Sequence, residues 1–162
     1  YISNNFQHAL NSLLFWPTST IISKSAFLDV GGFDERINLG EDIDLWIRLA
    51  YHNKVAFYNK VLAHYNFDGP NRAMNKRHDI TKNYINYTNK FKEWEKANND
   101  LRIFINNNRI GRIVEVFMNY PENKNEIVRF LNLIDYKNQK VKHILFSLLP
   151  YSMQKIIINT FY

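Results

Sequence analysis

The sequence predicts a helix-rich α/β protein, with a small α/β part in residues 1–70 and an all-helical region in residues 71–162. Two stretches favour strands in the first part. The short β-branched run TSTIIS at 18–23 is typical of a buried strand, and KVAFYNKVLAHYN at 54–66 has the pattern of two strands joined by a turn. In the second part the strand signals disappear and apolar residues recur at helical spacing.

The first helix expected is KSAFLDV, directly after the 18–23 strand. Ser23 can cap its beginning, and Gly31 can end it because glycine takes the left-handed conformation at little cost. Phe33, just beyond the glycine pair, is placed to pack back on the end of this helix.

A second, amphipathic helix follows in GEDIDLWIRLA. Its apolar residues recur at i, i+3, i+4 and i+7, which predicts one buried stripe made of Ile43, Trp46, Ile47 and Ala50. Asp44 and Arg48 have the i,i+4 spacing of an exposed ion pair.

The second part predicts a series of helices, and Asp68, Gly69 and Pro70 form the best candidate for the junction before it. The proline residues at 121 and 150 separate successive helices. The expected helices span 73–91, 92–107, 109–119, 123–135, 138–149 and 151–161.

The composition limits the class of protein. The 162-residue chain contains no cysteine, which excludes disulfides and thiol-bound zinc. It has no uncharged apolar run of about 18 residues and no signal-peptide pattern, so we expect a cytoplasmic protein without a spanning helix.

The charge is unevenly distributed. Residues 1–70 carry five Lys/Arg and seven Asp/Glu, whereas residues 71–162 carry sixteen and eight. A basic surface attracts phosphates or other acidic partners. One hypothesis for function is therefore a non-catalytic helical module that binds nucleic acid or an acidic partner, although no groove-reading motif supports nucleic acid.

An acidic pair, Glu41 and Asp42, opens the second helix directly after Gly40. Carboxylates at a helix start are stabilised by unpaired backbone N–H groups and by the helix dipole, so both can be simple capping residues. The alternative is a general base, which needs a rigid support within about 3 Å of the hydroxyl it deprotonates. A helix start provides such a support.

The stretch FWPTSTIISKSAFLDVGGFDERINLGEDIDLWIRLA resembles the acceptor-side half of inverting family 2 glycosyltransferases, which have the GT-A fold. The elements that match are GGFDE at 31–35 and EDIDLWIRL at 41–49. The resemblance covers roughly residues 4–72. It implies a sugar transferred from a nucleotide-diphospho-sugar donor to a sugar or lipid-linked acceptor, in surface polysaccharide or glycolipid synthesis.

The resemblance implies a role for each acid of the pair. Asp42 would be the catalytic base that takes the acceptor proton during an in-line, inverting displacement, and Glu41 would orient the acceptor. A divalent cation, Mn²⁺ or Mg²⁺, would balance the charge of the leaving nucleoside diphosphate.

The family's donor-binding half, with its Asp-x-Asp metal element, has no counterpart upstream. The only such pattern here is formed by Asp42 and Asp44, inside the predicted helix. We therefore expect this chain to be an incomplete fragment that lacks the donor-binding half and transfers no sugar alone.

Further candidate site residues follow from the resemblance or from chemistry. Either His64 or Asp68, or neither, would hold the metal, since the family's histidine position relative to a tyrosine falls on Asp68. The other candidates would bind substrate: Asn71 and Arg72 could contact diphosphate oxygens, Trp16 could stack on a sugar or be a core residue, and Thr18 lies beside it.

The last stretch, residues 140–162, mixes lysines with large apolar residues. It could lie on the inner face of an anionic membrane as a peripheral anchor, or cover the enzyme's core or a partner subunit. A proline at position 150 breaks it into two short pieces.

Overall fold

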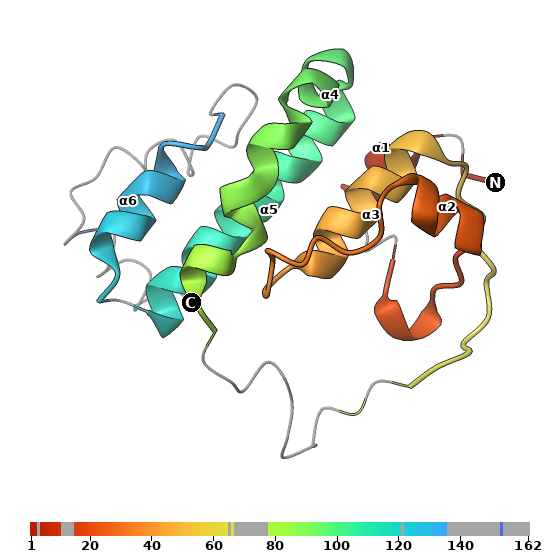
Figure 1. The fold of residues 1–162 in the computed structure, drawn as a ribbon, viewed down its shortest axis with the longest axis horizontal. Helices are drawn as coiled ribbons and strands as arrows, with labels where there is room; N and C mark the ends of the chain where they lie inside the picture. The colour runs from red at the N-terminus through yellow and green to blue at the C-terminus, as the bar shows by residue number, and fades with distance from the viewer. Residues whose placement is uncertain are drawn as a thin grey trace. The chain divides into compact units, whose positions relative to one another are not determined.

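The computed structural model describes residues 1–2, 4–10, 15–64, 66, 78–120, 122–135 and 153. The chain forms two compact units, Tyr1–Tyr84 and Ile85–Tyr162. The predicted junction at 68–70 lies outside the described residues. Within the described ranges every regular element is a helix, and the one β-type contact is an isolated bridge between Leu39 and Asn83 (Figure 1).

The predicted α/β fold, including half of a GT-A fold, is therefore wrong. Thr20 and Ser23 do have extended backbone angles, but the described residues form no strand ladder with them. In the 54–66 segment, Val55 O accepts a hydrogen bond from Ile2 N at 2.8 Å without starting a ladder. An extended segment becomes a strand only when a second backbone pairs with it, and β-branched composition does not specify that partner.

The first unit is organised around α3 (Glu41–His52), onto which α2 (Lys24–Asp29) packs. The Trp46 ring stacks on Phe15 with 5.1 Å between ring centroids. Burial of this apolar surface is the main stabilising term of the unit. One cluster of this core consists of Leu45, Trp46 and Leu49, with Phe15, Ile22, Ala26, Phe27 and Val30 packed against them.

The other helices of this unit are short. They are α1 (Asn5–Ala9), η1 (Pro17–Ser19) and η3 (Ile80–Lys82). The Asn5 amide of α1 donates hydrogen bonds to Ala50 O at 2.8 Å and Asn53 O at 3.1 Å, at the end of α3. This side chain therefore satisfies a carbonyl group that the last turn of α3 leaves without a helical partner.

The two ends of α2 agree with the sequence. Ser23 Oγ accepts a hydrogen bond from Ala26 N at 3.2 Å. At the other end, Gly31 N donates to Leu28 O and Gly32 N donates to Phe27 O, both at 2.9 Å, with positive φ at both glycines. This pair of bonds is a Schellman motif. Phe33 then returns to the helix and contacts the Phe27 ring edge-on at 5.8 Å.

The second unit is helical throughout its described residues. Its elements are η4 (Tyr84–Phe91, which begins at the boundary), α4 (Lys92–Ala97), α5 (Asn99–Asn119) and α6 (Lys124–Leu131). Figure 1 shows α5 as the long central helix, with α4 and α6 packed on it.

These helices partly follow the predicted boundaries. The break expected at residue 108 falls at Asn98 instead, whose side chain accepts from Leu101 N at 3.0 Å and caps α5. The range 73–91 contains only 3-10 turns in its described part. The helices predicted at 138–149 and 151–161 lie outside the described residues, apart from Met153.

A buried ion pair crosses the second unit from α4 to α5. The Arg109 guanidinium donates to both carboxylate oxygens of Glu95 at 3.1 and 2.9 Å, and its Nε donates to Thr88 Oγ1 at 3.2 Å. Both charged side chains are less than a tenth exposed. A two-bonded pair of this kind fixes the orientation of one helix on the other.

Among the described residues, no helix has both the length and the apolar character needed to cross a membrane. The basic tail at 140–162 lies outside the described residues except for Met153. Its role, either at a membrane surface or as a cover for the core or a partner subunit, stays a prediction.

Candidate functional site

The acidic pair lies in the first turn of α3, and the loop before this turn is held by residues far along the chain. Asn38 N donates to Lys82 O at 2.9 Å, and Tyr84 N donates to Leu39 O at 3.0 Å. Gly40 follows with φ +83° and is the residue from which α3 starts. The position of the acidic pair therefore depends on this contact with residues 82–84.

Gly40 is required for two independent reasons. Its φ lies in the left-handed region, which costs a residue with a Cβ roughly 1–2 kcal/mol. A Cβ there would also lie 2.6 Å from Cδ1 of the buried Tyr84 ring. The ring packs directly against the backbone, so there is no room for a side chain.

We expect Gly40→Ala to lower the free energy of unfolding by about 2–4 kcal/mol, because strain and overpacking add. The matched control is Gly31→Ala, which has the same φ of +83° but no atom within 4 Å of the added Cβ. The control should lose only about 1–2 kcal/mol. Urea unfolding measures both, and equal losses would show that the Tyr84 ring makes room.

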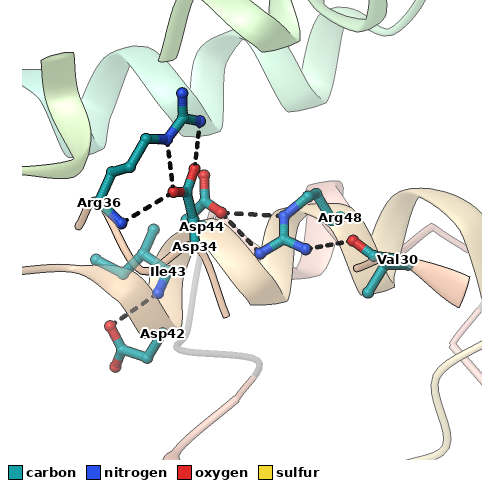
Figure 2. A network of polar contacts seen from close by, with 7 residues as sticks. All are labelled: Val30, Asp34, Arg36, Asp42, Ile43, Asp44 and Arg48. Atoms are coloured by element: carbon teal, nitrogen blue, oxygen red, sulfur yellow. Dashed lines mark hydrogen bonds and ion pairs between the residues drawn. The ribbon is translucent and has the colours of Figure 1, made fainter. Parts of the chain in front are cut away.

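Of the three acids in the first turn of α3, Asp44 has a structural role. Its Oδ2 accepts from Arg48 Nε at 3.0 Å and Nη2 at 2.8 Å, while Arg48 Nη1 donates to Val30 O at 2.5 Å (Figure 2). The predicted ion pair is present, but the prediction that it is exposed is wrong: the Asp44 side chain is 0% and the Arg48 side chain 12% exposed. The pair joins α3 to the end of α2.

Asp42 is placed differently. Figure 2 shows its carboxylate directed away from the Asp44–Arg48 pair. Oδ1 accepts from Ile43 N at 2.8 Å, so the helix start fixes the carboxylate, and no described residue donates a hydrogen bond to Oδ2. Asp42 and its neighbour Glu41 are both half-buried. The first turn thus offers one oriented carboxylate oxygen that can accept a proton from a ligand.

The aspartate of the GGFDE element is paired within its own turn. Asp34 accepts from Arg36 Nε and Nη2, both at 2.8 Å, and from Arg36 N at 3.2 Å. Figure 2 shows this pair near the start of α3. The Asp34 side chain is 12% exposed and the Arg36 side chain 66%, so the arginine covers the carboxylate from the solvent side.

Two of the candidate substrate-binding residues, Trp16 and Thr18, lie in the described part of the chain. Trp16 precedes η1 and is 38% exposed, so the alternative that it is a core residue is wrong; its neighbour Phe15 has that role. Thr18 is exposed within η1. Asp68, Asn71 and Arg72 lie outside the described residues.

The proposed metal ligands do not form a site in the described part of the chain. His64 is exposed, in a stretch without regular structure. The described residues contain no group of three or more histidine, aspartate or glutamate side chains arranged to hold a metal ion.

Sequence reasoning missed the residues that hold the loop before α3. Asn83 and Tyr84 are both fully buried, and η3, which precedes them, is capped by Asp79. Hydrogen bonds from Thr81 Oγ1 at 2.7 Å and Thr81 N at 2.9 Å lower the pKa of Asp79. The Asp79 cap could be recognised in HDITKNY, but nothing local indicates that this turn contacts Leu39.

Comparisons of the chain with protein-family models, with curated proteins and with solved structures find no match. Functional assignment therefore depends on the residues and geometry described above.

Proposed function

We propose that this chain is the acceptor-side part of an inverting glycosyltransferase, which moves a sugar from a nucleotide-diphospho-sugar to an acceptor hydroxyl in the synthesis of a surface polysaccharide or glycolipid. The observation that carries the proposal is the division of roles in the first turn of α3. Asp44 is used in a buried ion pair, whereas Asp42 is fixed through Oδ1 and has Oδ2 available. The spacing of these acids in EDIDLWIRL supports the same function.

In the proposed reaction, Asp42 Oδ2 takes the proton of the acceptor hydroxyl. The acceptor oxygen forms a bond to the anomeric carbon as the bond from that carbon to the diphosphate oxygen breaks. The nucleoside diphosphate leaves with the electron pair of the broken bond. A single in-line displacement inverts the configuration of the anomeric carbon, and a base on a rigid support makes the attack possible at neutral pH.

Glu41 is proposed to orient the acceptor, because it is half-buried beside Asp42 and is not part of the Asp44–Arg48 pair. The donor, and the divalent cation expected with it, are proposed to be bound by a part of the enzyme other than the described residues. This assignment separates acceptor binding, which this chain should retain, from sugar transfer, which it should not perform alone.

Acceptor binding can be tested on this chain by NMR. The ¹⁵N-labelled protein is titrated with a panel of hexoses, N-acetylhexosamines and their disaccharides. We expect at least one saccharide to shift the amide signals of residues 40–43. Asp42→Asn should weaken the response, because an amide NH2 group replaces Oδ2 and cannot accept a hydrogen bond from the hydroxyl. Shifts confined to other parts of the chain would contradict the proposal.

A further inference from the structure

A cavity of about 540 Å³ lies in the second unit. It is bounded by α4, by the start of α5 and by residues 132–135, which follow α6. Ligand sites in proteins have volumes of roughly 300–1,000 Å³. The cavity is therefore large enough to hold a small organic molecule, and it belongs to a different unit from the acidic pair of α3.

The charged side chains around the cavity leave a positive excess. Two carboxylates stand among the described lining residues, and both are paired: Glu95 with Arg109 at 2.9 Å, and Asp135 with Arg102 at 3.3 Å. The other charged residues among them are two lysines, Lys92 and Lys96.

Lys92 and Lys96 are one helical turn apart on α4, so they share a face. Lys96 also contacts Glu93 at 2.7 Å, but both partners are more than 70% exposed, and such pairs contribute little and exchange readily. Two lysine ammonium groups spaced in this way can bind an anion together, and lysine is a common phosphate ligand.

The uncharged lining residues indicate what is attached to the anion. Three are asparagines, Asn89, Asn99 and Asn132, whose amides match hydroxyl groups as donors or acceptors. Among the described residues, the lining includes no aromatic ring, so none of them offers a nucleobase a stacking partner. This chemistry favours a polyhydroxylated ligand over a nucleotide.

We propose that this cavity binds the phosphate ester of a polyhydroxylated compound of about the size of a sugar phosphate. Lys92 and Lys96 bind the phosphate, the asparagine amides bind the hydroxyls, and the buried Glu95–Arg109 pair forms a rigid wall. The proposal does not rest on glycosyl transfer at α3 and can hold or fail independently of it.

The test is isothermal titration calorimetry of the full chain with glucose 1-phosphate, inorganic pyrophosphate, adenosine monophosphate and glucose. We expect saturable one-site binding of glucose 1-phosphate, weaker binding of pyrophosphate and of adenosine monophosphate, and none of glucose. Raising NaCl from about 50 to about 500 mM should weaken the binding, because screening shortens the range of the lysine charges.

The double variant Lys92→Gln, Lys96→Gln should raise the Kd for glucose 1-phosphate at least tenfold. Lys124→Gln removes one lysine charge at an exposed position of the same unit that does not line the cavity, and should leave the Kd unchanged. Asp42→Asn should also leave it unchanged, which separates this site from the proposed catalytic one. No binding of glucose 1-phosphate, or equal affinity in the double variant, would overturn the proposal.

Discussion

In an enzyme that contains this chain together with the proposed donor-binding part, we expect Asp42→Asn to lower kcat by about 10²–10⁴-fold, the usual contribution of a positioned general base. The amide keeps an oxygen that can accept from Ile43 N, so the side chain stays in place. The amide is not basic at neutral pH, so it cannot take the proton of the acceptor hydroxyl. Steady-state transfer assays measure the loss, and donor Kd and circular dichroism should be nearly unchanged.

Glu41→Gln is the matched variant, because it neutralises the adjacent acid on the same turn. An orienting role predicts a smaller loss, seen mainly as a higher KM for the acceptor. If Asp42→Asn retains full kcat, or loses it only through unfolding, then Asp42 is a helix-capping residue and not the base.

Asp44→Asn should lower the free energy of unfolding by about 3 kcal/mol. Removing one partner of a buried ion pair typically costs 3–5 kcal/mol, and the low end applies because Arg48 retains some exposure. The asparagine can offer the guanidinium at most one neutral amide oxygen, so Arg48 keeps Val30 O as a partner but loses its counter-charge. Urea unfolding followed by tryptophan fluorescence should show a lower midpoint with a similar slope.

Asp29→Asn is the control for this loss, because it makes the same chemical change at an exposed position of the same unit. We expect it to change stability by less than about 0.5 kcal/mol. Similar effects of the two substitutions would mean that the Asp44–Arg48 pair is not worth more than a surface charge.

Local patterns predicted two helices of the first unit, α2 and α3, but not α1, η1 or η3. The Ser23 cap, the glycine pair after α2 and the apolar stripe of α3 all depend on residues within one or two turns of each other. The strands were wrong because their existence depends on a partner that composition does not encode. The exposed fraction of a residue such as Asp44 likewise depends on which helix packs over it.

In the candidate site, too, the sequence predicted what depends on neighbouring residues and missed what depends on distant ones. The sequence identified Glu41 and Asp42 at a helix start, which is a local property. It did not identify Tyr84 behind Gly40, or the joining of Glu95 to Arg109 beside a cavity, because these contacts join residues on different elements. Side chains of common types at irregular separations give no periodic signal.

Residues 38–40 contact residues 82–84. The smallest part of the protein that keeps the acidic pair in position must therefore include both segments. The family-like motif ends near residue 72, yet the ring that packs on Gly40 belongs to Tyr84. A shortened chain that stopped at the end of the motif would retain the acidic pair and lose what holds it. Domain shuffling or expression trials guided by the motif alone would therefore separate the proposed catalytic residue from its own support.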